Sequence, residues 1–444
     1  MYVLFCAGGV VTLSFLLAFK YFERSWAPPA IFFVFGFLSS NYFYPYSIIS
    51  LDNESIVFDN YNFEAALAYA TYSFVALLIG YSSYFLIGKR YAKYRRLSTG
   101  YVSENTLSAL IFLLALFLII TLASHPFLSS SGAMRGENAY LSNDHVDIFY
   151  RIRFIVSQTL IPLIVSIYIA SLTLASKGAR RARRIAIAAV LCVVISSLLS
   201  FDRHFAVSAI FMILLVYHYR VKKISIFSGF SIVAILLSLQ FVRLLRNFNI
   251  PYADISISHF FSIFDEIELL PIVIGPLTAI AGFDVFTNVL DIVPARDDFK
   301  YGATYLSSMM GLFTPRALGL GSYDEITPSR WYVEMYAPGT TSHGFDFSML
   351  AEAYINFSDF MPLAFIVVGL MLAWLSVNIR QTSSPFILFL SVVSMEVLTF
   401  SLRMDSNALL KGLTYKALPI ILLIMLMNRF FKSGFLVMNR KAQR

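Results

Sequence analysis

Residues 106 to 123 read TLSALIFLLALFLIITLA, a run without a single charged side chain. An α-helix rises about 1.5 Å per residue, so a run of this length crosses most of the roughly 30 Å hydrocarbon core of a bilayer. Similar apolar runs occupy residues 185 to 199 and 360 to 374. Because a helix satisfies its own backbone hydrogen bonds in lipid, these runs predict an all-α integral membrane protein.

The composition of the whole chain agrees with this prediction. Of 444 residues, 58% are hydrophobic and only 14% are charged, which is far from an average soluble domain. We therefore expect a polytopic protein with about eleven transmembrane helices. The first run lacks a basic n-region and a cleavage site, so we expect it to remain as a span. The expected spans are residues 2 to 19, 29 to 51, 63 to 88, 106 to 124, 154 to 176, 185 to 201, 204 to 219, 224 to 246, 360 to 378, 384 to 401 and 416 to 431.

The basic residues indicate how the chain is oriented in the membrane. Lys and Arg accumulate in short cytoplasmic loops. Placing the basic clusters inside makes every alternate loop cytoplasmic, with the N terminus outside and the C terminus inside. The net charge of +8 therefore reflects topology and gives no reason to expect nucleic acid as a partner. The clusters are Lys89-Arg90, Arg95-Arg96, Lys177 to Arg184, Arg220 to Lys223 and Arg429 to Arg444.

One outer loop, residues 247 to 359, is much longer than the others. We treat residues 1 to 444 as a single membrane domain that includes this loop. Residues 255 to 270 and 277 to 292 are apolar with interspersed acids, which is typical of amphipathic helices at a membrane surface. Gly and Pro residues interrupt the rest. Irregular backbone at membrane depth needs protein or water around it, so we expect the loop to cap or line a cavity open to the outside.

Within this loop, residues 301 to 356 carry the strongest candidates for acid–base chemistry. Ser348, Glu352 and Asn356 are spaced four apart and would share one face of a helix. Glu352 is our first candidate for a general base. His343 is the second, because imidazole titrates near neutral pH. For both residues, a purely structural hydrogen bond is the alternative.

Several arginines are candidates for binding an anion. A guanidinium group suits phosphate because its planar fork binds two oxygens at once. Arginine within a span is costly unless it faces a pocket or an anion. The candidates are Arg203, Arg243, Arg246, Arg316 and Arg330. The alternative for Arg203 is a local pair with Asp202. The alternative for Arg316 and Arg330 is an ion pair with Asp324 or Glu334.

Aromatic residues and absent motifs narrow the possible functions. Trp331 and Tyr332 could stack on sugar rings, although core packing explains them equally well. We find no Gly-rich phosphate loop, HExxH helix or GxSxG elbow, and no Asp-x-Asp pair in a setting that would hold a metal on a sugar nucleotide. These absences argue against ATP-driven transport and nucleotide-sugar chemistry. Cys6 and Cys192 lie in apolar runs and suggest neither a disulfide nor a zinc site.

Three stretches of the long loop form one group: Tyr301-Gly302-Ala303-Thr304-Tyr305-Leu306, Phe313-Thr314-Pro315-Arg316 and Glu352-Ala353-Tyr354-Ile355-Asn356-Phe357. Together they resemble the signature region of the bacterial oligosaccharide repeat-unit polymerases, the Wzy-type O-antigen polymerases. The Asp202-Arg203-His204 segment resembles the upstream arginine element of the same family. Ser358 and Asp359 follow where the family pattern tends to have glycine.

The resemblance implies a metal-independent, cofactor-free glycosyltransferase with a GT-C-like fold in the bacterial inner membrane, acting in lipopolysaccharide or related polysaccharide biosynthesis. Its partners would be undecaprenyl-pyrophosphate-linked donor and acceptor glycans, the bilayer and a chain-length-regulating co-polymerase, but no nucleic acid. On this reading Arg203, Arg243 and Arg316 bind the departing pyrophosphate, and Arg246 and Arg330 are further candidates for the same role. Glu352 or His343 would deprotonate the acceptor, and Trp331, Tyr332, Tyr354 and Asn356 would contact glycan.

Two other functions share the same donor. A lipid-linked oligosaccharide flippase or polysaccharide exporter would also need a cationic cavity, but its loops are usually short. An O-antigen ligase would differ in its acceptor. The long outer loop favours chemistry over passage, and the stretch from Glu352 to Phe357 favours the polymerase.

Overall fold

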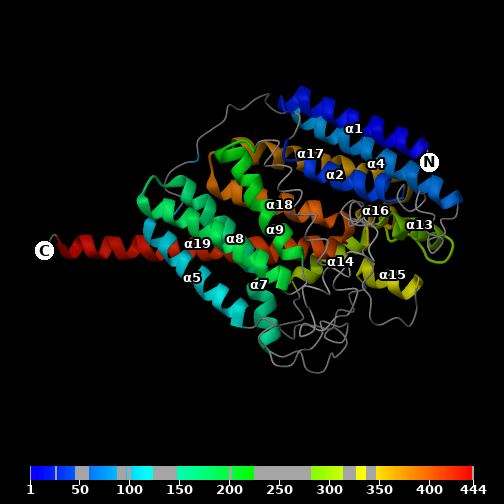
Figure 1. Cartoon of the computed structure of the whole chain (residues 1–444). Helices are drawn as coiled ribbons and strands as arrows, with labels where there is room; N and C mark the ends of the chain where they lie inside the picture. Colours follow the sequence, from blue (N-terminus) through cyan, green and yellow to red (C-terminus); the bar gives the residue numbers. More distant parts are fainter. Residues whose placement is uncertain are drawn as a thin grey trace, which may run out of the picture. The chain divides into compact units, whose positions relative to one another are not determined.

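The computed structural model describes residues 2–25, 28–45, 60–87, 97, 102–123, 148–199, 203–224, 282–313, 327–336 and 347–442. All regular secondary structure in these ranges is helical, which confirms the all-α prediction (Figure 1). Helices lie at every expected span that falls within these ranges. The expected span at residues 224 to 246 lies outside the described residues except for Ile224.

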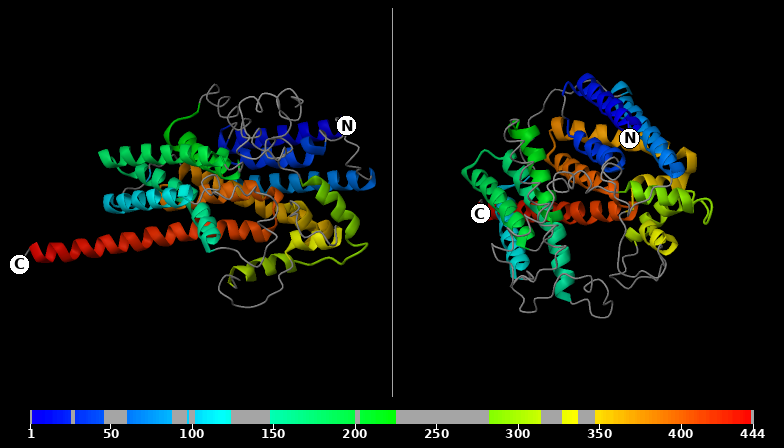
Figure 2. Two further views of the ribbon diagram at one scale, coloured as in Figure 1. Left: turned by 60° about the horizontal axis from the view of Figure 1, so that its bottom comes forward. Right: turned by 45° about the vertical axis from the view of Figure 1, so that its right-hand side comes forward.

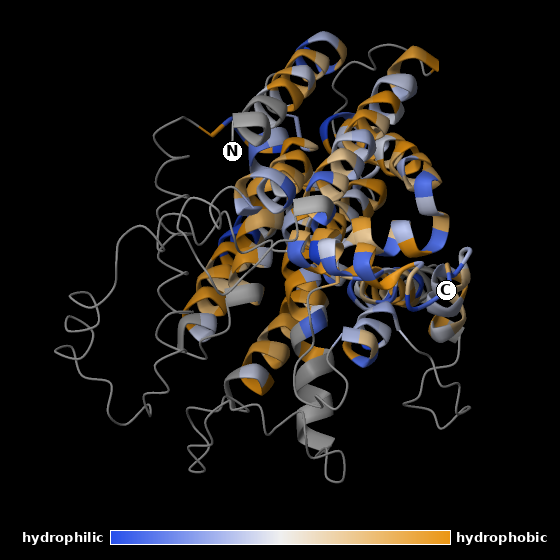
Figure 3. Cartoon of the chain, turned by 90° about the vertical axis from the view of Figure 1, so that its right-hand side faces the viewer, coloured by the Kyte–Doolittle hydropathy of each residue, from blue (hydrophilic) through white to orange (hydrophobic). Residues whose placement is uncertain are grey.

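Five of the described helices are long and apolar enough to cross a membrane, which supports a multi-helix membrane protein. Figure 3 shows hydrophobic residues along most of the length of the longer helices. The count of eleven spans, the orientation and the GT-C-like fold stay predictions. The five are Asn62–Ile87, Glu104–Thr121, Met349–Gln381, Pro385–Arg403 and Ser406–Phe430, and the shorter apolar helices are Ile31–Phe43, Gln158–Thr173 and Phe205–Val221.

Contacts divide the chain into two compact units. The first unit contains residues 1–93, 273–377 and 397–412, and the second contains residues 94–272, 378–396 and 413–444. Three helices, α17 (Met361–Gln381), α18 (Pro385–Phe400) and α19 (Ser406–Ala442), contribute residues to both.

The first unit is built on α1 (Tyr2–Glu23), α4 (Asn60–Ile87) and the first part of α17, with α2 (Ile31–Leu38) continuing as the π-helix η1 (Ser39–Phe43). Figures 1 and 2 show α1 and α4 side by side. Glycines let α4 and α17 approach closely. A Cβ atom on Gly80 would collide with the Ile366 carbonyl, and one on Gly369 with the Leu77 carbonyl. Small residues commonly permit such contact between membrane helices.

The described part of the long loop forms short helices of the first unit. They are α13 (Phe283–Ile292), α14 (Ala303–Phe313), α15 (Pro328–Tyr336) and α16 (Met349–Phe357), and the 3-10 turn η5 (Ser358–Phe360) leads into α17. Polar contacts attach this segment to the N-terminal half of α4. Asn62 Nδ2 donates to Asp291 Oδ1 at 2.7 Å, and the Tyr69 hydroxyl donates to Asp359.

The second unit packs α5 (Glu104–Ala123), α7 (Ile148–Thr173), α8 (Lys177–Leu199) and α9 (Arg203–Val216), which continues as the π-helix η2 (Tyr217–Val221), with parts of α18 and α19. Polar side chains cross-link it. Lys416 Nζ donates to both carboxylate oxygens of Glu396, at 2.7 and 2.9 Å, and Ser208 Oγ donates to Glu396 Oε1 at 2.6 Å. Arg220 Nη2 donates to the carbonyls of Asn378 and Thr382, near the C-terminal end of α17.

Candidate functional site

The candidate site is centred on the carboxylate of Glu352, which projects from α16 and is only 2% exposed. Its Oε1 atom accepts hydrogen bonds from Thr304 Oγ1 at 2.9 Å and from Ser406 Oγ at 2.6 Å. Its Oε2 atom accepts the backbone N–H of Ser406 at 2.6 Å. Ser406 is the first residue of α19, so the carboxylate lies at a helix N terminus, where unpaired N–H groups favour negative charge.

Asn356, one turn beyond Glu352, fixes the direction of one of these hydrogen bonds. Its amide nitrogen donates to Thr304 Oγ1 at 2.7 Å and to the Glu352 carbonyl at 2.8 Å. Since the Thr304 oxygen accepts from Asn356, the single Thr304 hydroxyl hydrogen is directed to the carboxylate. The Asn356 side-chain oxygen accepts the N–H of Gly302 at 2.9 Å. Hydrogen bonds therefore join residues 302 and 304 to residues 352 and 356.

A left-handed turn holds this arrangement on the α14 side. Tyr301 has a φ of 47° and Gly302 a φ of 89°, in a region where side chains are disfavoured. The turn is pinned to α16 at both ends, because the Lys300 N–H donates to the Ile355 carbonyl at 2.6 Å and the Gly302 N–H reaches Asn356. Glycine thus has a specific conformational role at residue 302.

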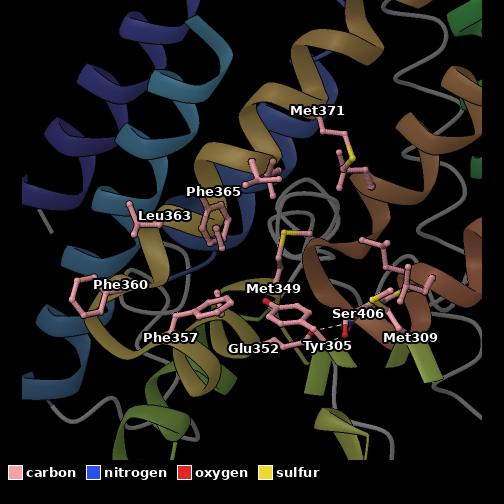
Figure 4. Close-up of a pocket in the computed structure, with 18 residues that line it drawn as sticks. Tyr305, Met309, Met349, Glu352, Phe357, Phe360, Leu363, Phe365, Met371 and Ser406 are labelled. Carbon is pink, nitrogen blue, oxygen red and sulfur yellow. Dashed lines mark hydrogen bonds between the residues drawn. The ribbon is translucent and has the colours of Figure 1, made fainter. Parts of the chain in front are cut away.

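Glu352 also lines a cavity of about 610 Å³ within the first unit (Figure 4). This volume is in the range of ligand-binding pockets. The lining is mostly apolar and comes from α14, α16, η5, α17, the end of α18 and the first turns of α19 with Met404 before them. The polar lining residues are Tyr305, Glu352 and Ser406. Figure 4 shows Tyr305 and Glu352 side by side at one edge of the pocket.

A neighbouring carboxylate, Asp405, has a structural task. Its Oδ1 accepts the N–H of Ala408 at 2.9 Å, so it caps α19. Its Oδ2 accepts the Ser329 hydroxyl at 2.6 Å, which attaches α15. By capping α19, Asp405 positions the Ser406 N–H that holds Glu352.

The structure describes only part of the predicted site. Glu352 and Asn356 meet in the network above. Arg203 begins α9, but its side chain is not among those described. The predictions for His343, Arg243, Arg246 and Arg316 lie outside the described residues.

The predicted residues on α15 have partners that suit the structural alternatives. Arg330 Nε donates to Glu334 Oε1 at 2.9 Å, and both side chains are exposed. The Trp331 indole N–H donates to Asp297 Oδ2 at 2.6 Å, and the Tyr332 hydroxyl accepts from Asn288 at 2.9 Å. Both rings are buried, so core packing explains them in this arrangement. Their roles, and that of Arg330, in substrate binding stay predictions.

Tyr354, the remaining predicted glycan contact, is 7% exposed on α16. Its ring packs against those of Tyr69, Phe286 and Phe299. This environment is also typical of a core residue, and its contact with glycan stays a prediction.

Two of the residues that hold Glu352 were not selected from the sequence. Thr304 lies in the stretch from Tyr301 to Leu306, and its residue type alone predicts no role in the site. Ser406 lies after the tenth expected span in what was expected to be a short outer loop. The available signal was the Asp405-Ser406 pair, because an Asp followed by an apolar helical run is an N-cap pattern.

The chain matches no protein-family model, no curated protein and no solved structure. The resemblance to the repeat-unit polymerases therefore stays a prediction, and any function rests on the site itself.

Proposed function

We propose that the protein polymerises undecaprenyl-pyrophosphate-linked oligosaccharide repeat units on the outer face of the bacterial inner membrane, with pyrophosphate-lipid as leaving group. The apolar helices supply the membrane setting that this function needs. The proposal makes Glu352 the general base.

One observation carries the proposal. Two stretches that resemble the polymerase signature, residues 301–306 and 352–357, are bonded to each other around one buried carboxylate. The contacts run from Gly302 through Asn356 and Thr304 to Glu352. Such support holds a reacting group in a fixed geometry, which is a general requirement for efficient catalysis.

The hydrogen bonds suggest which oxygen reacts. Oε1 of Glu352 accepts two hydrogen bonds, whereas Oε2 accepts one within the described part of the chain. A carboxylate oxygen has room for about two, so Oε2 can accept one more. We assign to Oε2 the proton of the acceptor hydroxyl.

The reaction then proceeds as a substitution at the anomeric carbon of the donor. The acceptor O–H bond breaks and its proton moves to Glu352, while the acceptor oxygen forms a bond to the anomeric carbon. The bond between that carbon and the pyrophosphate oxygen breaks, and its electron pair leaves with the pyrophosphate. Positive charge would stabilise this leaving group, which is the role predicted for the arginines.

The test is deletion of the gene in the native host, followed by complementation with wild type, Glu352→Gln, Arg316→Ala and Glu64→Gln. Glu64 is an exposed carboxylate on α4 and serves as the matched control. The surface glycan is resolved on a gel, and the membrane level of each variant is measured.

We expect deletion to leave a single repeat unit on the lipid acceptor. Wild type and Glu64→Gln should restore the ladder, whereas Glu352→Gln and Arg316→Ala should not. Loss of even the single repeat unit on deletion would instead indicate export or ligation and would overturn the proposal.

A further inference from the structure

Tyr305 occupies a distinctive place beside the carboxylate. It follows Thr304 on α14 and lines the same cavity as Glu352 (Figure 4). Its ring stacks on that of Phe357, with centroids 5.7 Å apart and an interplanar angle of 19°. The ring is therefore held in place without help from its hydroxyl group.

The Tyr305 hydroxyl has no hydrogen-bond partner within the described part of the chain. Fully buried tyrosines of the first unit do have one. The Tyr42 hydroxyl lies 3.0 Å from Thr71 Oγ1, the Tyr81 hydroxyl donates to Glu23, and the Tyr332 hydroxyl accepts from Asn288. Tyr305 is half-buried and lines the cavity, so its hydroxyl is available to donate to a group that enters the cavity.

Electrostatics determine what Tyr305 can offer. Burial, followed by the charge of Glu352, raises the pKa of the Tyr305 phenol. The phenol therefore keeps its proton and can donate a hydrogen bond but cannot serve as a base. Glu352, as a carboxylate, can only accept.

Tyr305 presents a donor and Glu352 an acceptor to the same cavity, and the two together match a particular class of ligand. A hydroxyl group accepts one hydrogen bond through its oxygen and donates another through its hydrogen, so it satisfies both residues at once. A phosphate would satisfy Tyr305 but would meet the negative charge of Glu352. The pair therefore favours a neutral hydroxyl over an anion.

We propose that Tyr305 contacts substrate and donates a hydrogen bond to the acceptor-sugar hydroxyl whose proton Glu352 removes. This inference rests on the proposed function and deepens it, because it places the acceptor between two named side chains. The contact holds the hydroxyl oxygen while its hydrogen points to Oε2 of Glu352.

The test uses Tyr305→Phe, which removes the hydroxyl and keeps the ring that stacks on Phe357. Tyr42→Phe is the matched control, because it removes a buried tyrosine hydroxyl of the same unit whose partner is Thr71. Full-length proteins are assayed in lipid nanodiscs with lipid-linked repeat unit extracted from the deletion strain. Initial polymerisation rates are measured over a range of its concentration, and thermal unfolding is followed in parallel.

We expect Tyr305→Phe to lower kcat/KM about tenfold, as for loss of one hydrogen bond, with an unchanged unfolding midpoint. Tyr42→Phe should keep wild-type kcat/KM. Wild-type kcat/KM in Tyr305→Phe, or equal losses in the two variants, would overturn the inference and leave the proposed function standing if the wild type polymerises. Absence of wild-type polymerisation would overturn both.

Discussion

Two buried carboxylates, Glu352 in the first unit and Glu396 in the second, are held in different ways. Glu396 is fully buried and receives the Lys416 ammonium on both oxygens. Glu352 receives only neutral donors among the described residues, and it lines a cavity. The charge of Glu396 is thus balanced within the protein, whereas Glu352 keeps a position for a substrate. Burial alone therefore does not identify a reactive carboxylate, and the type of partner separates the two.

The largest expected effect on stability comes from breaking the pair in the second unit. Lys416→Met strands the buried Glu396 charge, which typically costs about 3–5 kcal/mol. Adding Glu396→Gln removes that charge and should recover most of the loss. Unfolding of both variants in detergent, monitored by circular dichroism, checks the expectation. If Lys416→Met alone were as stable as the variant that also carries Glu396→Gln, the ion pair would not be what stabilises this unit.

A smaller effect is expected from removing one hydroxyl donor at each carboxylate. Thr304→Val takes a donor from Glu352 and an acceptor from Asn356, at a cost of about 1–3 kcal/mol. Ser208→Ala takes a donor from Glu396, which Lys416 still holds. We expect polymerisation to fall severalfold in Thr304→Val and to stay near wild type in Ser208→Ala, as measured by glycan ladder intensity at equal membrane levels. Equal ladders from the two variants would remove the functional distinction between the sites.

The turn before α14 should give a still smaller effect. Gly302→Ala forces a side chain into a backbone conformation with φ of 89°, which costs about 1–2 kcal/mol. Its N–H positions Asn356, so polymerisation should also fall. Gly9→Ala is the control, because Gly9 lies within α1 and a Cβ there meets nothing within 4 Å. Thermal unfolding of both variants should show a loss only for Gly302→Ala, and an equal change in both would exclude the conformational explanation.

The smallest expected effect is on the pH dependence of stability and involves Asp297. This carboxylate pairs with the Lys300 ammonium and also accepts hydrogen bonds from neutral donors. Burial raises the pKa of this carboxyl, but hydrogen bonds from Lys300, the Trp331 indole and the Asp298 N–H together lower it below its ordinary value. Asp297 therefore stabilises the fold above its ordinary pKa, near pH 4, and this contribution is lost as pH falls through its lowered pKa.

Trp331→Phe removes one of the donors that lower the pKa of Asp297. We expect the loss of stability between pH 5 and about pH 3 to be slightly smaller in this variant than in wild type. Thermal unfolding across that range measures it. An identical pH dependence would show that the indole does not contribute.

The sequence predicted the helical framework because long apolar runs are local features that depend little on distant contacts. It also predicted that Glu352 and Asn356 share a helix face, since their spacing of four follows from helix geometry. It did not predict Ser406, which lies 54 residues from Glu352 and meets it only through tertiary packing.

The roles of other residues at the site could not be decided from the sequence, for a physical reason. An aromatic residue such as Trp331 gives the same sequence signal whether it faces a sugar or the core. The structure shows its ring buried and its indole N–H bonded to Asp297, and its contact with glycan stays a prediction. The pairing of Arg330 with Glu334 was among the alternatives because residues four apart are neighbours on a helix.

The central claim is that Glu352 is the base and Glu396 is a structural carboxylate. The most direct test compares Glu352→Gln and Glu396→Gln in nanodiscs with the extracted lipid-linked repeat unit, with rates normalised to folded protein. We expect Glu352→Gln to lower kcat by about 100-fold or more and Glu396→Gln to keep kcat within a fewfold of wild type. Wild-type kcat in Glu352→Gln, with lost activity in folded Glu396→Gln, would contradict this assignment.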